Sequence, residues 1–173
     1  MAAPPRAKDP LGARGGFFFR DGAARRAYIG AMTATIQTIR DDFALLDEWE
    51  DRYRYLIELG EALPPFPEAA RTPANKVPGC VSQVWLTTAT GPGLDPVLDF
   101  RGDSDAHIVR GLVAVMLALF SGRPASEILR TDAEATLKGL GLDEHLSPQR
   151  ANGLRSMVKR IRRDAEAATR QTA

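Results

Sequence analysis

The chain contains one cysteine, and its position is the main chemical feature of the sequence. Cys80 lies in "NKVPGCVSQVW", directly after Pro78 and Gly79. Glycine lets the backbone bend or approach a neighbour closely, and proline stiffens the chain before it. A free cysteine often packs as a small hydrophobe, whereas function concentrates on loops. The residues alone therefore leave two interpretations open, an inert buried cysteine and a reactive thiol.

The rest of the sequence limits what such a thiol could do. No second cysteine could resolve an oxidised Cys80 into a disulfide, so a thiol that accepts a group from outside fits better than a two-cysteine redox couple. His107 and His145 are the only histidines that could act as a general base, which keeps a stand-alone thiol enzyme, a peroxidase or hydrolase, as an alternative. The histidines do not have metal-ligand spacing, and we predict no metal site.

Composition and charge exclude several classes of partner. Lys and Arg number 23 against 22 Asp and Glu, so no net basic field favours nucleic acid or an anionic membrane. The longest apolar run, 108–120, is too short to span a bilayer, which needs about 20 residues. A lone cysteine gives no disulfide framework, and we expect a cytoplasmic protein.

The N-terminal residues differ from the rest of the chain. Residues 1–31 are rich in Ala, Gly, Pro and Arg and show no helical or strand period, so we expect a disordered extension there. A transit segment fits less well because the stretch lacks serine. Met32, which opens a patterned segment, is a candidate translation start. We predict a single domain over residues 32–173.

The spacing of apolar residues predicts two helices in the first part of the domain. Apolar residues at helical spacing mark a short helix up to Leu46, and Asp47 with Glu50 resembles a capping box that opens a second helix. The proline-rich segment 64–79 then predicts a long ordered loop ending beside Cys80.

A hairpin and further helices follow. Alternation from Val81 to Thr90 predicts a strand, "GPG" a turn, and 94–102 a second antiparallel strand. Three candidate N-cap residues, Asp103, Ser104 and Asp105, precede a core helix that runs to about Phe120. Two short helices and a long final helix, capped by Ser147 with Pro148 at its first position, complete the chain. These elements predict an α+β fold in which helices pack on one face of a small antiparallel sheet of two to three strands.

Three separated motifs resemble one family. "VPGCVSQVWL", "GDSDAHIVRGLVAVM" and "GLDEHLSPQRANGLRSMVKRI", together with "DEWEDRYRYLIELGEALPPFP", are similar to the SufE family of sulfur acceptors. The resemblance runs from about Asp41 to the last helix. It implies a SufE/IscU-like fold and a sulfur-transfer accessory protein for iron–sulfur cluster assembly, not an enzyme in its own right.

The resemblance also implies a mechanism. Cys80 would take sulfur from a persulfide of a cysteine desulfurase, SufS-like or of the paralogous CsdA-like branch, stimulate that enzyme, and pass the sulfur to a cluster-assembly scaffold. The chain itself would need no cofactor, because pyridoxal phosphate belongs to the desulfurase. We expect a monomer or weak homodimer.

Six further residues match the family's motifs and are expected to support the cysteine or bind the partner: Gly79, Ser82, Gln83, Asp105, Arg150 and Asn152. Gly153, inside the last helix, costs about 1 kcal/mol relative to alanine, so we expect close packing there. Arg155, Lys159 and Arg163 form an i,i+4 basic stripe that is either a docking surface or a solvated face. An IscU-type scaffold is a poorer fit because it needs several cysteines.

Overall fold

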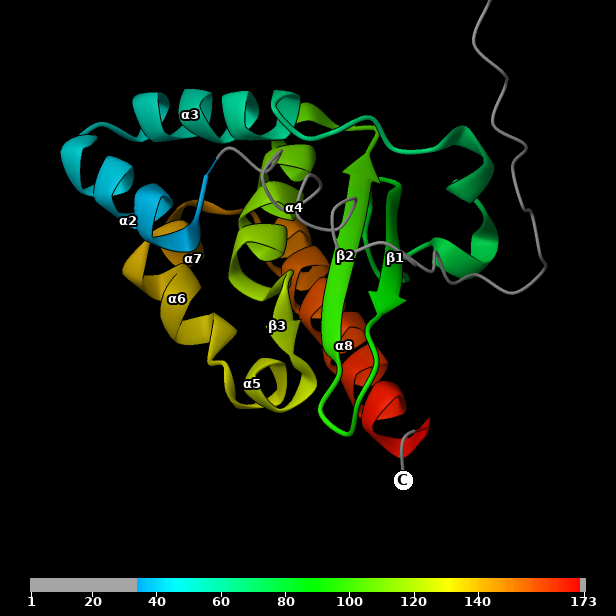
Figure 1. Cartoon of the computed structure of the whole chain (residues 1–173). Coiled ribbons are helices and arrows are strands. Elements are labelled where there is room, and N and C mark those ends of the chain that lie inside the picture. Colours follow the sequence, from blue (N-terminus) through cyan, green and yellow to red (C-terminus); the bar gives the residue numbers. More distant parts are fainter. Residues whose placement is uncertain (1–33, 172–173) are drawn as a thin grey trace, which may run out of the picture.

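The computed structural model describes residues 34–171, and the prediction of a disordered extension over 1–31 lies outside these residues. In chain order the elements are α2 (Ile36–Leu45), α3 (Trp49–Glu61), the 3-10 turns η1 (Glu68–Ala70) and η2 (Pro73–Asn75), β1 (Val84–Thr90), β2 (Val97–Ser104), α4 (His107–Phe120), β3 (Arg123–Pro124), α5 (Ala125–Arg130), α6 (Ala133–Gly139), α7 (Leu142–His145) and α8 (Pro148–Gln171). Figure 1 shows α4 and α8 on one side of the sheet. The predicted α+β fold is confirmed.

The sheet has the order β1-β2-β3 and is antiparallel throughout. β1 and β2 form the predicted hairpin, with Val84 opposite Ser104 and Thr90 opposite Leu98. The inner face is apolar: Val84, Leu86, Leu98 and Phe100 are all buried. β2 lies so close to α4 that a Cβ on Gly102 would stand 2.7 Å from a methyl of Val113.

Two helices approach each other through glycine. A Cβ built on Gly111 of α4 would lie 2.1 Å from the carbonyl oxygen of Leu56 in α3, and one on Gly60 would lie 2.7 Å from the amide nitrogen of Gly111. Both contacts are with backbone, which cannot rotate away. The α3–α4 crossing therefore depends on the absence of side chains at these two positions.

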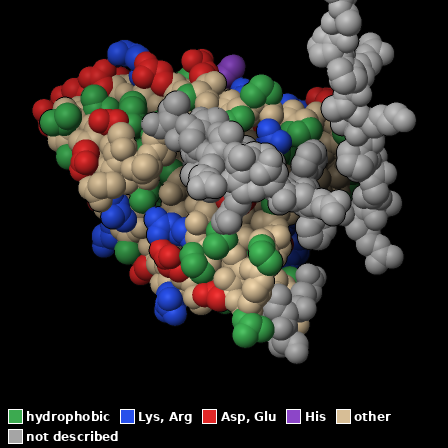
Figure 2. Space-filling model, viewed as in Figure 1, with side chains coloured by type: hydrophobic (Ala, Val, Ile, Leu, Met, Phe, Trp, Pro, Cys, Tyr) green, Lys and Arg blue, Asp and Glu red, His purple; other side chains and the backbone are tan. Residues whose placement is uncertain are grey.

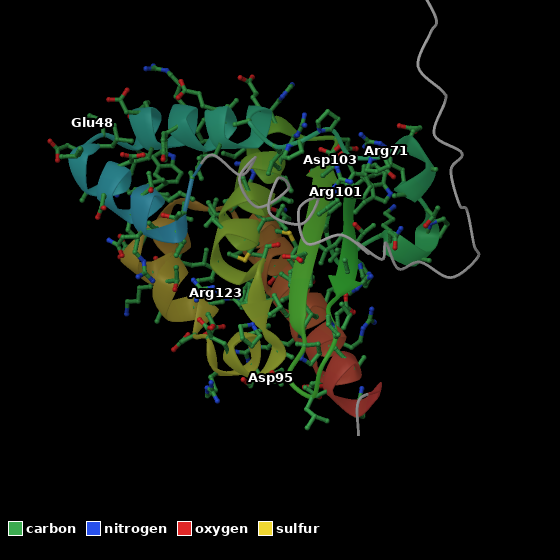
Figure 3. The ribbon with its side chains drawn as sticks, in the orientation of Figure 1. Glu48, Arg71, Asp95, Arg101, Asp103 and Arg123 are labelled. Atoms are coloured by element: carbon green, nitrogen blue, oxygen red, sulfur yellow. The ribbon has the colours of Figure 1, made fainter. Side chains whose placement is uncertain are left out.

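The helix starts differ in part from those expected. Glu48, not Asp47, precedes α3 and makes no side-chain cap hydrogen bond, so the capping-box prediction is wrong (Figure 3). Ala106 precedes α4, because the polar side chains before it bind elsewhere in the fold. Ser147 is confirmed at the start of α8, where its hydroxyl accepts the N–H of Arg150. The sequence did not indicate the one-turn helix α7.

The outer face of the sheet carries a buried ion-pair cluster. Asp103 on β2 is 5% exposed and its carboxylate lies 2.6 Å from the Arg71 guanidinium and 3.1 Å from that of Arg110. Figure 3 places Arg71 and Asp103 side by side at the end of β2. Arg71 also stacks over the rings of Phe66 and Trp85. The cluster thus fixes the proline-rich segment to the sheet, which removes Asp103 from the capping role expected for it.

We predict that Gly111→Ala lowers the free energy of unfolding by more than about 3 kcal/mol, because overpacking against rigid backbone forces the helices apart. Gly139→Ala is the matched control, since a Cβ at this helical position meets no atom within 4 Å. The control should gain up to about 1 kcal/mol from helix propensity. Urea denaturation of the three proteins measures both effects, and equal stabilities of the two variants would contradict the prediction.

Candidate functional site

Cys80 lies in a six-residue loop that is closed at its base. The N–H of Val77 donates to the carbonyl of Val84 at 2.8 Å, and Lys76 pairs antiparallel with Trp85. Val77 and Val84 are both buried, 1% and 0% exposed, so each end of the loop is anchored in the core. The segment between them, residues 78–83, contains no regular strand. The prediction of a strand from Val81 is therefore wrong, since β1 begins at Val84.

The thiol itself rests on α8. Cys80 Sγ donates to the carbonyl oxygen of Gly153 at 3.6 Å, and the side chain packs against the edge of the core. A Cβ on Gly153 would stand only 3.3 Å from the sulfur. The close packing expected at Gly153 is thus confirmed, and the group it accommodates is Cys80.

Gly79 has a conformation that requires glycine. Its φ is +85°, in the left-handed region that L side chains rarely adopt, and a Cβ there would meet the Ser156 hydroxyl at 2.8 Å. The backbone conformation therefore favours glycine, and a side chain here would also have to displace the Ser156 hydroxyl. Next to the half-buried Cys80, Val81 is 82% exposed.

Main-chain bonds to the β2–α4 junction fix the C-terminal end of the loop. The carboxylate of Asp105 accepts the N–H of Gln83 at 2.9 Å, and the Ser104 hydroxyl donates to the Gln83 carbonyl at 2.8 Å. The N–H of Asp105 donates to the same carbonyl at 3.3 Å. The expectation that Ser104 and Asp105 cap α4 is therefore wrong, because their side chains hold Gln83 and the local turn instead.

The other predicted residues lie nearby without contacting the sulfur. Ser82 is a half-buried member of the loop. Arg150 occupies the first turn of α8, where its amide is capped by Ser147. Asn152 is exposed and accepts a hydrogen bond from Arg155. The structure thus places Gly79, Cys80 and Gln83 in one loop, which Asp105 of the β2–α4 junction holds at Gln83, and the loop rests on α8.

Arg160 connects the loop base to α8, and sequence reasoning missed it. Its guanidinium forms an ion pair with Asp164 at 3.0 Å, while Asp164 also accepts the Thr88 hydroxyl of β1. Further bonds reach the carbonyls of Ala74 in η2 and Leu86 in β1. In the sequence Arg160 is one of several arginines at helical spacing, and no local pattern distinguishes it from the exposed ones.

Within the described part of the chain, no general base forms a hydrogen bond with the thiol. Among the described residues, the carbonyl of Gly153 is the hydrogen-bond partner of Cys80, while His145 stacks on Trp49 with ring centroids 4.3 Å apart. His107 is an exposed residue at the start of α4. Within residues 34–171, no group of three metal-ligating side chains could hold a metal ion. None of the described helices has the length and apolar character needed to cross a membrane.

Burial raises the pKa of the Cys80 thiol above its ordinary value. Desolvation disfavours the charged thiolate, so the resting protein holds the neutral form. Because the folded chain binds this proton more tightly than the unfolded chain does, the protonated thiol stabilises the fold. This stabilisation is complete below the pKa of the unfolded chain and is lost as the pH rises through the higher pKa of the folded chain.

We predict that iodoacetamide alkylation of the folded chain rises with pH around a midpoint above that of a cysteine peptide. The reason is that only the thiolate reacts, and burial keeps its fraction low. Mass spectrometry of timed samples at several pH values gives the profile, and the same chain in urea provides the unfolded reference. A folded midpoint equal to or below that of the unfolded chain would refute the burial effect.

We also predict that Gly153→Ala speeds alkylation of Cys80 at neutral pH several-fold. The added methyl competes with the sulfur for its position, so the loop is pushed toward solvent. Gly139→Ala, which adds the same group to a helix at an open position, should alkylate like the wild type. If both variants are alkylated at the wild-type rate, the shielded position of the Cys80 sulfur does not depend on the missing side chain at Gly153.

Comparisons with known proteins agree with this architecture. A solution structure of a hypothetical protein from Thermus thermophilus matches with a TM-score of 0.59 over 77% of this chain and 94% of that chain; its 18% identity supports the fold alone. An uncharacterized SufE-like protein of Rhizobium meliloti (strain 1021) is 65% identical over 136 residues, covering 78% of this chain and 96% of the relative. A second from Rhizobium etli is 62% identical over 134 residues, 77% and 90% of the two chains.

The family model described as "SufE: Fe-S metabolism associated domain" matches residues 37–165. This range contains the whole cysteine loop, the β2–α4 junction and the part of α8 on which the thiol rests. The chain therefore belongs to the SufE family, whose domain is associated with iron–sulfur metabolism.

Proposed function

We propose that this protein is a sulfur acceptor, which takes sulfur from the persulfide of a cysteine desulfurase onto Cys80 and passes it on for iron–sulfur cluster assembly. The observation that carries the proposal is the placement of Cys80. The loop that bears the chain's single thiol is short, anchored at both ends, and half shielded on α8. Such a loop presents one sulfur without exposing it permanently.

The reaction exchanges one sulfur atom between two cysteines. The Cys80 thiolate attacks the outer sulfur of the donor persulfide, the donor S–S bond breaks, and a new S–S bond forms at Cys80. The donor cysteine leaves as a thiolate and takes up the proton that Cys80 lost. The products are a Cys80 persulfide and a free donor thiol, with no net oxidation or reduction.

The resting geometry separates protection from reaction. On α8 the thiol is neutral and partly covered, which lowers its reactivity toward other oxidants and electrophiles. When the loop leaves α8, the sulfur is solvated, its pKa falls toward the ordinary value, and the thiolate fraction increases. Gly79 is the proposed hinge, since its φ of +85° lies where only glycine moves freely.

The remaining family residues have proposed supporting roles. Asp105 holds the amide of Gln83 and keeps the C-terminal end of the loop in place. Ser82, Arg150 and Asn152 lie in or beside the loop and are proposed to contact the desulfurase. The protein acts as an accessory factor in the cytoplasm, with pyridoxal phosphate supplied by the partner.

A stand-alone thiol enzyme is the other candidate class, and the geometry disfavours it. A peroxidase or hydrolase would need a base near the sulfur, whereas His145 is stacked on Trp49. An IscU-type scaffold would need several cysteine ligands, and the chain has one.

The test measures sulfur directly. Incubation with a purified cysteine desulfurase, pyridoxal phosphate and cysteine should add about 32 Da, the mass of one sulfur, to the intact chain. Cys80→Ser should gain no mass, and reduction with dithiothreitol should remove the gain from the wild type. The chain should also increase the desulfurase turnover, whereas Cys80→Ser should not. A wild type that gains no mass with desulfurases of both the SufS-like and CsdA-like branches would overturn the proposal.

A further inference from the structure

The described part of the molecule has two regions of opposite charge. α8 carries seven Arg and Lys against two Asp and Glu, while residues 36–61, which form α2 and α3, carry eight Asp and Glu against three Arg. Figure 2 shows acidic side chains gathered over α2 and α3 at the upper left. The near-zero net charge of the chain therefore hides a strong asymmetry, and fields of this kind act on the approach of partners.

Three cations on α8 form the basic stripe: Arg155, Lys159 and Arg163. All three are exposed. Arg155 bonds to the neutral amide of Asn152, and Arg163 lies 3.8 Å from Asp164, whose carboxylate is already engaged by Arg160 and Thr88. Among the described residues, no carboxylate neutralises Arg155 or Lys159 within ion-pair distance. The stripe therefore keeps its charge available to a partner.

The stripe lies on the helix that supports the cysteine loop. Gly153 supports Cys80, and Ser156 contacts Gly79. On this helix Lys159 lies three positions after Ser156, close to the same face, whereas Arg155, one position before it, projects about 100° around the helix axis. A protein that binds the Cys80 loop approaches the helix that carries these exposed cations.

The stripe does not activate the resting thiol. Desolvation by burial raises the pKa of Cys80, and among the described residues no cation counters this rise. The charges are thus directed outward, where they could act on an approaching surface but not on the sulfur at rest.

We propose that the basic stripe is a docking surface for an acidic rim around the donor cysteine of the desulfurase. This inference rests on the proposed function. Unlike charges attract the partner to this helix and orient it before Cys80 moves, which raises the association rate and, through it, the affinity at low ionic strength. Nucleic acid fits less well, because the stripe is narrow and the acidic α2–α3 region repels a polyphosphate.

The test compares charge reversal at two places. The stripe variant is Arg155→Glu with Lys159→Glu. The control is Lys138→Glu with Arg170→Glu, which makes the same change in net charge on α6 and near the far end of α8. At low ionic strength, the concentration of the stripe variant that half-saturates desulfurase stimulation should rise about tenfold or more. The control should match the wild type, and about 0.5 M NaCl should remove most of the difference.

Stimulation and the mass gain at saturating concentration should stay as in the wild type, because the variant retains Cys80. Arg155→Gln with Lys159→Gln should give a half-saturating concentration between those of the wild type and the charge-reversed variant. This neutral variant tests the charge effect even if the reversed variant folds poorly. Circular dichroism and thermal melting check that the variants fold alike.

A second readout needs no partner protein. Dithiobis(nitrobenzoate), a dianionic disulfide, and dithiodipyridine, a neutral one, both react with the Cys80 thiolate. Relative to the neutral reagent, the anionic one should react more slowly with the stripe variant than with the wild type. Loss of that difference at high salt would support an electrostatic cause.

The outcomes separate the two proposals. Equal half-saturation of the stripe and control variants, with a normal mass gain, would overturn the docking surface alone. A wild type that gains no sulfur would overturn the proposed function and the desulfurase as occupant together. Binding of the wild type, but not of the stripe variant, to a DNA oligonucleotide at about 0.15 M salt would overturn the acidic protein rim in favour of a polyphosphate.

Discussion

The site depends on one backbone hydrogen bond, that between Val77 and Val84, and on the burial of both side chains. Each fully buried valine contributes about 1.5–3 kcal/mol to stability. Releasing either end of the loop would therefore require that part of the core to unpack. Arg71 and Arg160 then tie the preceding segment to the sheet and to α8. Because the base is rigid, loop motion is confined to six residues. The fold therefore provides a fixed scaffold for the loop, and the loop opening that we propose need not disturb the core.

The sequence was sufficient to predict the general architecture because local patterns there agree with tertiary packing. The hairpin has a turn of Gly and Pro between a run rich in β-branched residues and a second segment in which Leu98 and Phe100 alternate with polar residues, and α4 is apolar on most sides, as a central helix must be. Predictions failed where polar side chains had a choice of partners. Asp103, Ser104 and Asp105 could each cap a helix, but a buried ion pair with Arg71 and bonds to Gln83 come from segments distant in sequence. Local patterns carry no information about those competing partners.

For the candidate site, the sequence singled out Cys80 and Gly79, whose functional roles stay a prediction, and it indicated that Gly153 must pack closely. It could not state what Gly153 packs against, since residues 80 and 153 come together only when α8 lies under the loop. The strand prediction from Val81 failed for a related reason. Alternation there satisfies the period of a strand, yet the main chain of Gln83 bonds to Asp105 and Ser104, which leaves Val81 exposed. Arg160 was missed because burial, not sequence spacing, separates it from its neighbours on α8.

The length of the loop sets how far the sulfur can travel. Cys80 stands three residues after Val77 and four before Val84, and an extended chain spans at most about 3.3–3.6 Å per residue. The backbone of Cys80 can therefore move no more than about 10 Å from the anchor at Val77. A donor sulfur at the bottom of a deep, narrow channel would be out of range. Under the proposed function, the desulfurase must therefore hold its donor cysteine within about one nanometre of its own surface, or carry that cysteine outward on a mobile segment.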